Sequence, residues 1–136
     1  MSYEIIDVAG DVGLSVKGKS LEECFFNAAQ GLYSLITDPA SVDTGEKKTL
    51  EIEGDNVEEL LIRFLNELIF LFDAYGFIGK TVSVQLNNGK LEAQIDGEFF
   101  DPEKHERRLL VKAATYHNLE ILQEEGRYVV KIVFDI

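Results

Sequence analysis

Acidic side chains near the two ends of the chain are the first candidates for chemistry. Asp7 and Asp11 bracket Ala9-Gly10, and Asp135 is the penultimate residue. Carboxylate and exposed carbonyl oxygens are the ligands that hard cations such as Ca²⁺ and Mg²⁺ prefer, so the first pair is a candidate cation site. The alternative is an ordinary turn before a strand, because Asp and Gly are typical turn residues.

The end of the chain carries a less usual arrangement. Asp135 closes an apolar strand pattern and is followed by Ile136. If this end docks in a sheet, the Asp135 carboxylate and the α-carboxylate of Ile136 become neighbouring anions. Two anions held close together require a cation or a proton. Two interpretations stay open at this point, a metal site and a solvated chain end.

A third candidate group lies in the stretch Lys112-Ala113-Ala114-Thr115-Tyr116-His117. In an unbroken strand, residues five apart point to opposite faces, so Lys112 and His117 share a face only if a bulge intervenes. Lys112 is suited to contacting a phosphate or an acidic partner, and His117 to acid–base chemistry or metal ligation. Both residue types are also common on plain strand surfaces. His105, in the loop around Pro102, is a weaker candidate of the same kind.

The charge balance limits the classes of partner. The chain has 13 Lys and Arg against 25 Asp and Glu, a net charge of −12. This charge repels a phosphate backbone, so tight direct binding of RNA or DNA is not expected, whereas cations and basic protein surfaces suit it. Glycine-rich phosphate loops, paired cysteines and HExxH zinc motifs are absent from the sequence. The composition favours a cation-binding or partner-binding protein over a self-contained catalyst.

The same composition predicts one cytoplasmic domain spanning residues 1–136. Cys24 is the single cysteine and cannot form an internal disulfide, and no stretch near the start has the pattern of a signal peptide. The longest apolar stretch, residues 57–77, is interrupted by charged side chains, so it predicts an amphipathic helix and no membrane span.

Two amphipathic helices are predicted to position these side chains. The first starts at Ser20, which with Glu23 forms a capping box, and stops at Asp38-Pro39. Cys24 lies on its apolar stripe. The second starts after Asn56, the expected cap, and ends near Gly76.

Period-two alternation predicts strands in the other segments, at residues 12–16, 49–53, 82–86, 91–95, 111–115, 117–122 and 128–135. Asn87-Asn88-Gly89 and Glu124-Glu125-Gly126 are predicted to turn two hairpins. The last strand has apolar residues on both faces, which is typical of a central strand. Residues 97–108 are predicted to form a loop. The order β-α-β-α followed by a run of strands predicts an α+β fold, a mainly antiparallel sheet with both helices packed on it.

Several blocks along nearly the whole chain together resemble one known family. They are Tyr3-Glu4 through Asp11-Val12-Gly13, residues 21–38, residues 60–68, Gly97-Glu98, His105, Lys112-Ala113 with Thr115-Tyr116-His117, and Val133-Phe134-Asp135-Ile136. The KAxTYH stretch and the FDI ending are specific in combination. On these residues the sequence resembles the archease family, small activator proteins of the 3′-phosphate tRNA-splicing ligase.

The resemblance implies a divalent cation site. In archeases the aspartate of the first motif, the penultimate aspartate and the final residue bind a cation that is commonly assigned as calcium. Those positions are Asp11, Asp135 and Ile136 here, and Mg²⁺ and Mn²⁺ are the alternatives to Ca²⁺. The sequence departs from the family's His-Thr-Ala at Val8-Ala9-Gly10, which removes any role of that histidine, and from a frequent tryptophan at Phe64.

The resemblance also gives Lys112 and His117 a place in a family motif, so they are the expected contacts to a nucleotide or a protein partner. The expected function is that of a metal-binding activator, not itself a catalyst, which promotes guanylylation and multiple turnover of the tRNA-splicing RNA ligase through protein–protein contact. One alternative is a general chaperone or modulator of RNA-processing enzymes, which would not depend on Asp11 or Asp135. A metal-dependent hydrolase is a weaker alternative, because two-metal chemistry needs more converging carboxylates.

Overall fold

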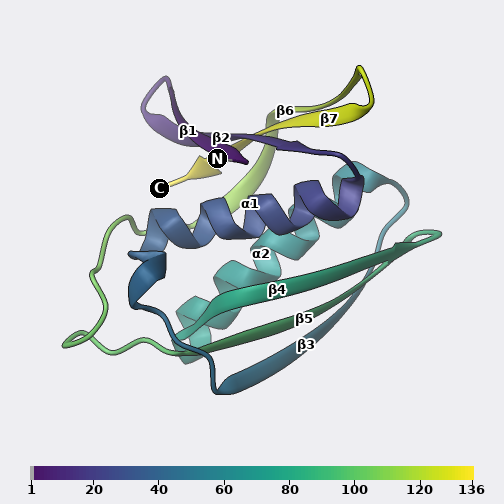
Figure 1. Ribbon diagram of the computed structural model, residues 1–136. Helices are drawn as coiled ribbons and strands as arrows, with labels where there is room; N and C mark the ends of the chain where they lie inside the picture. Colours follow the sequence, from purple (N-terminus) through teal and green to yellow (C-terminus); the bar gives the residue numbers. More distant parts are fainter. Residues whose placement is uncertain (1) are drawn as a thin grey trace.

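Two helices lie between two antiparallel sheets in the computed structural model, which describes residues 2–136 (Figure 1). One sheet has four strands in the order β1-β2-β7-β6, and the other has three in the order β3-β5-β4. The elements are β1 (Tyr3–Val8), β2 (Asp11–Gly18), α1 (Leu21–Ile36), the 3-10 turn η1 (Pro39–Ser41), β3 (Glu46–Glu53), α2 (Val57–Tyr75), β4 (Phe77–Asn87), β5 (Lys90–Phe99), β6 (Ala113–Glu124) and β7 (Arg127–Asp135).

The predicted helix boundaries are confirmed by their caps. The Ser20 side chain accepts a hydrogen bond from the Glu23 N–H at 3.1 Å, and Asn56 accepts one from Glu59 at 2.8 Å. The left-handed Gly76, with φ of 72°, ends α2. Cys24 lies buried on α1, as its place on the apolar stripe predicts.

The α+β prediction is confirmed, but the strands divide between two sheets rather than forming one. The helices pack on both, because α1 contacts β2 on one side and β4 on the other. Accordingly α1 is buried almost all round, and a single hydrophobic cluster joins both sheets through the two helices. The rings of Phe25 and Phe64 connect the helices, with centroids 6.0 Å apart.

Three hairpins share the same two-residue turn, in which a left-handed residue precedes a glycine. Asn88-Gly89 and Glu125-Gly126 form two of them, as predicted, and Ala9-Gly10 forms the third between β1 and β2. Both residues of each turn have positive φ, the conformation that matches the twist of antiparallel strands. In the segment Val8-Ala9-Gly10, Val8 therefore ends β1 and Ala9-Gly10 form the hairpin turn.

Two strand predictions need correction. Residues 3–8 form the edge strand β1, which the alternation pattern missed because its side chains are partly exposed on both faces. The predicted strands 111–115 and 117–122 belong mainly to one strand, β6, whose register with β7 shifts between Thr115 and Glu120. Asn118, with φ of 54°, lies in this irregular part.

A loop of residues 100–112, here called the capping loop, connects the two sheets. Its first residue donates to Gly76 O at 2.7 Å, and its last, Lys112, donates to Asp135 O at 2.8 Å. In between, Arg108 and Leu109 donate backbone hydrogen bonds to the carbonyls of Ile36 and Leu35 at 3.0 and 2.9 Å. The loop thereby satisfies carbonyl groups that the end of α1 leaves without helical partners.

Among residues 2–136, neither helix combines the length and the apolar content that a membrane crossing would require.

Candidate functional site

Two predicted carboxylates are brought to one edge of the four-stranded sheet. Asp11 opens β2 and Asp135 closes β7, and these strands pair antiparallel with Val12 opposite Phe134. Continuing this register by one residue places Asp11 beside Asp135. Since Val12 and Phe134 are buried against the helices, alternation along each strand directs both Asp side chains to the outer face.

Lys112 and Ile136 reach the same edge from other segments. The Lys112 N–H donates to Asp135 O at 2.8 Å, and Ala113 lies opposite Asp135 in the pairing of β6 with β7. Ile136 follows Asp135 directly and is exposed. Asp11, Asp135 and Ile136 are called the acidic edge below, and Lys112 is its neighbour.

The donors of the acidic edge are compatible with a hard divalent cation. Neither Asp11 nor Asp135 forms an ion pair with another described residue, so both carboxylates are available. Within residues 2–136, no three His, Cys, Asp or Glu side chains come together to hold a metal ion. A cation at this edge would therefore rely on two side-chain carboxylates, the carboxylate of Ile136 and water. All of these are oxygen ligands, which suit Ca²⁺, Mg²⁺ or Mn²⁺ better than softer metals.

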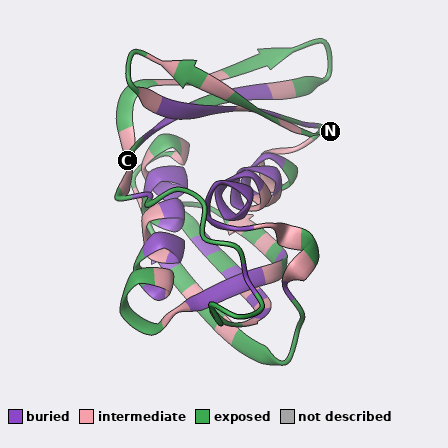
Figure 2. Ribbon diagram, turned by 90° about the vertical axis from the view of Figure 1, so that its left-hand side faces the viewer, coloured by how far each residue is buried: buried purple, intermediate pink, exposed green. Residues whose placement is uncertain are grey.

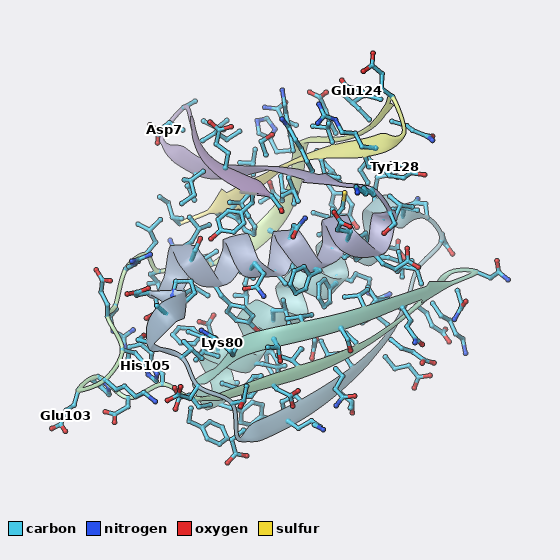
Figure 3. The ribbon with its side chains drawn as sticks, in the orientation of Figure 1. Asp7, Lys80, Glu103, His105, Glu124 and Tyr128 are labelled. Carbon is cyan, nitrogen blue, oxygen red and sulfur yellow. The ribbon has the colours of Figure 1, made fainter. Side chains whose placement is uncertain are left out.

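Asp7, the other acidic candidate, is separated from Asp11 by the hairpin. It lies opposite Val12 in the β1–β2 register and so shares that residue's side of the sheet, not that of Asp11. Figure 3 shows Asp7 near the tip of the β1–β2 hairpin, directed away from the body of the molecule. The interpretation as a turn before a strand describes Ala9-Gly10 correctly, whereas Asp11 gains its neighbours from β7.

His117 makes no side-chain hydrogen bond or ion pair with this group among residues 2–136. It is exposed and lies in the irregular part of β6, between the two registers with β7. No hydrogen bond or ion pair joins its ring to Lys112 among the contacts of residues 2–136. Its assignment as a partner contact thus stays a prediction.

His105, the weakest candidate by sequence, is the most firmly held imidazole. Its side chain is completely buried, its Nδ1 accepts a hydrogen bond from the Asp101 N–H at 2.8 Å, and its Nε2 lies 2.9 Å from Glu98 Oε2. Because Nδ1 accepts, the ring proton belongs on Nε2, which donates to Glu98. Figure 3 shows His105 directed inward from the capping loop, whereas Glu103 points outward.

Glu98, whose side chain is partly exposed, is the shared acceptor of this group. The backbone N–H of Asp43 is the largest cause lowering its pKa from 4.5 to about 2, partial burial opposes the change, and hydrogen bonds from Lys104 and His105 add to it. Lys104 lies 2.9 Å from Glu98 and 2.7 Å from Asp43. The group ties the capping loop to β5, a structural role that the sequence signals only through a Glu and a His flanking a proline loop.

A shallow depression of about 510 Å³ lies on the outer face of the three-stranded sheet. It is lined mainly by polar side chains: Thr49, Glu51, Ser83, Gln85, Glu92 and Gln94. Glu51 and Glu92 are directly opposite each other in the β3–β5 register, so the surface repels anions there. It lies across the helix layer from the acidic edge and includes none of the predicted site residues.

Relatives of this chain share its full length. The family model of the Archease protein family (MTH1598/TM1083) matches residues 3–136. A protein from Sulfolobus acidocaldarius called protein archease is 39% identical over 136 residues, covering 98% of each chain. A protein archease from Pyrococcus abyssi is 36% identical over 139 residues, again covering 98% of each.

Solved structures show the same arrangement. The solution structure of protein 1598 from Methanobacterium thermoautotrophicum is similar with a TM-score of 0.80 and 33% identity, covering 99% of both chains. A Thermotoga maritima crystal structure described as an archease and possible chaperone has a TM-score of 0.71 over 96% of this chain and 94% of that one. At 20% identity, this second likeness shows the fold alone. With the family match and the sequence relatives, the chain belongs to the archease family.

Proposed function

We propose that this protein is a cytoplasmic, metal-dependent activator of a tRNA-splicing RNA ligase. The observation that supports this most is the convergence of Asp11, Asp135 and Lys112 at one edge, from segments far apart in the chain. These are the same positions that the family resemblance assigns to cation binding and partner contact. Full-length family membership supports the same conclusion.

The acidic edge would hold the cation through Asp11, Asp135 and the carboxylate of Ile136. A bound divalent ion supplies concentrated positive charge on a protein of net charge −12. The Asp135 side chain is exposed and that of Asp11 is half-buried, so an ion held between them would lie on the outer face of the sheet, where phosphate groups in a ligase cleft can approach. The overall acidity of the chain favours docking against a basic cleft and disfavours tight binding of free RNA.

Lys112 adds a second positive group next to the proposed ion. Its side chain is exposed, and it forms no ion pair with another described residue. The hydrogen bond from its backbone to Asp135 fixes its position relative to the acidic edge. In this proposal Lys112 contacts the nucleotide or an acidic group of the ligase during guanylylation, and the exposed His117 lies further along the chain in β6.

The decisive measurement is multiple-turnover ligation by the tRNA-splicing ligase of the same organism, with and without this protein, at fixed GTP and metal. Stimulation should be strong with the wild type and lost with Asp11→Ala and with Asp135→Ala. Asp7→Ala is the matched control, because it removes the same charge from the same hairpin on the other side of the sheet. Equal stimulation by all four proteins would reject the metal-dependent activator.

A general chaperone is the second candidate, and one surface feature favours it. Phe70, Tyr75 and Phe99 are 50%, 61% and 44% exposed around the end of α2, and such apolar patches often bind other proteins. The Thermotoga protein is described as a possible chaperone. Suppressed aggregation of unrelated enzymes that survives in Asp11→Ala and Asp135→Ala would favour this function over ligase activation.

A further inference from the structure

The capping loop combines an ordered backbone with exposed apolar side chains. Residues 100–112 contain no helix or strand, and connections of this length inside a compact fold usually carry function. Figure 2 shows the loop as a largely exposed segment crossing the face of the molecule on which the C-terminus also lies.

The backbone of the loop is held by the end of α1. Besides the two backbone hydrogen bonds to Leu35 and Ile36, the Arg108 guanidinium donates to Ser34 O at 2.9 Å. From the opposite direction, the Thr37 hydroxyl donates to Glu106 O at 2.6 Å. A loop fixed in this way loses little conformational entropy when a partner binds it.

The side chains that this backbone presents are strongly exposed leucines. Leu110 is 63% exposed and Leu109 39%, whereas Val111 between Leu110 and Lys112 is buried at 3% and anchors the segment. Ile136, 41% exposed, is close by, because Lys112 is hydrogen-bonded to the residue that precedes it. Two exposed leucines therefore precede the Lys112 anchor in the chain, and the exposed Ile136 follows the residue to which Lys112 is bonded.

The four Lys and Arg residues of the capping loop divide into paired and unpaired cations. Lys104 and Arg108 are occupied by ion pairs within the loop region. Arg107, 4.8 Å from the centre of the Phe100 ring, and Lys112 form no ion pair with described residues. On a protein of net charge −12, these two unpaired cations flank the leucines.

We propose that Leu109, Leu110 and Ile136, flanked by Arg107 and Lys112, form a docking ridge for the ligase. The occupant is a protein surface with an apolar pocket for Leu110 and carboxylates at its rim that pair with the two cations. This inference rests on the proposed function, since it names how the activated ligase recognises the protein. The ridge supplies binding, while the acidic edge supplies the metal-dependent effect.

The test is the dissociation constant of the complex with the ligase, measured by calorimetric titration together with ligation rates. Leu110→Asp should weaken binding about tenfold or more, the effect of removing an interface hot spot. Leu110→Arg should weaken it less, because the carboxylate rim repels aspartate and attracts arginine. Leu122→Asp is the matched control, since Leu122 is also an exposed leucine, at 43%, and lies far along β6, beside the β6–β7 turn.

The melting temperatures of all variants are measured to show that each remains folded, as expected for substitutions of exposed leucines. Stimulation by saturating Leu110→Asp should return to the wild-type level, whereas Asp135→Ala should fail at any concentration. If the wild type does not stimulate the ligase, the proposed function fails and the ridge fails with it. If the wild type stimulates and Leu110→Asp binds equally well, the ridge alone is rejected.

Two other occupants of the ridge would also overturn the proposal. A second copy of the chain predicts self-association in sedimentation equilibrium that Leu110→Asp abolishes. A lipid surface predicts binding to vesicles of anionic phosphatidylserine and phosphatidylcholine that the same substitution abolishes. In both cases ligase binding would be unchanged in the variant.

Discussion

The two sheets of this protein differ in how they are assembled and in what they present to solvent. The three-stranded sheet joins strands within residues 46–99. Its outer face is polar and carries only a shallow depression. The four-stranded sheet joins strands from both ends of the chain, with β7 between β2 and β6. The candidate site residues all lie in or next to this second sheet.

The outer face of the four-stranded sheet is more apolar than that of the three-stranded sheet. Val133 and Val129 point away from the helices yet are only 4% and 9% exposed. Ile6 and Val8 from β1 lean over Gly13, where an added Cβ would lie 3.0 and 3.2 Å from them. The three-stranded sheet is thus built from one continuous stretch of chain, whereas the candidate site residues lie where distant segments meet.

The largest expected effect is on the stability of the fold, when a substitution disrupts the three-stranded sheet. In Gly97→Ala the added Cβ would collide with Ile78 O and lie 2.8 Å from Gly79 Cα, backbone atoms that cannot move aside. We expect a loss of about 3 kcal/mol or more in the free energy of unfolding, measured by urea titration. The Ca²⁺ affinity of the protein that remains folded should not change.

Ser83→Ala, on the outer face of the same sheet, is the control for this substitution and should stay within about 0.5 kcal/mol of the wild type. A Gly97→Ala protein of normal stability would contradict the close backbone approach. An altered Ca²⁺ affinity would instead show that the two sheets are coupled.

The next effect concerns the cation at the acidic edge. If it binds there, Ca²⁺ at 100 times its dissociation constant should stabilise the wild type by about 2.7 kcal/mol, visible as a raised melting temperature. Asp135→Asn should remove this stabilisation, and appending residues after Ile136 should reduce it by displacing the carboxylate. Unchanged Ca²⁺ affinity in the tailed protein would exclude Ile136 as a ligand.

A smaller effect on stability is expected from removing the Glu98 carboxylate, which links β5 to the capping loop. The folded pKa of Glu98, about 2, is below its ordinary value of 4.5, so its contribution to stability is complete above about pH 4.5 and is lost as the pH falls toward 2. Glu98→Gln should therefore be less stable than the wild type at neutral pH, with the difference disappearing near pH 2.

Urea unfolding followed across this pH range measures the difference. Glu103→Gln, in the same loop but directed outward, should follow the wild-type curve (Figure 3). Parallel curves for Glu98→Gln and wild type would mean that the carboxylate does not stabilise the fold.

The smallest expected effect on stability comes from a substitution of Tyr33, in the interface between α1 and β4. Among residues 2–136 the buried hydroxyl of Tyr33 has no hydrogen-bond partner of ordinary geometry, and burial raises the pKa of Tyr33. Tyr33→Phe removes this unsatisfied group at constant shape, so we expect stability to be unchanged or to rise by about 1 kcal/mol. Chemical denaturation of Tyr33→Phe beside Tyr75→Phe, where the ring is exposed, provides the comparison. A clear loss in the buried variant would reveal a hydrogen bond to Gly79.

Local structure followed closely from local sequence. Ser20, Asn56 and Gly76 mark helix ends because a cap or a left-handed residue acts on neighbours a few positions away. Asn88-Gly89 specifies a hairpin for the same reason. The edge strand β1 escaped prediction because its partly exposed side chains give no alternation.

The candidate site was foreseen in its residues but not in its surroundings. Asp11, Asp135, Ile136 and Lys112 were identified from residue chemistry and family resemblance, and their cation and partner roles stay predictions. The buried contact of His105 with Glu98 had no clear signal, because a histidine in a polar loop looks the same whether it is buried or exposed.

The sequence by itself determined the helices, their caps, the turns and the family, since these depend on neighbouring residues or on whole-chain similarity. Only the tertiary structure decided that the strands form two sheets and that β2 pairs with β7, the pairing that brings Asp11 toward Asp135. The physical reason is that alternation specifies which side of a strand is buried, but not which strand it pairs with. Pairing is chosen by the packing of both helices between the sheets, a property of the complete core.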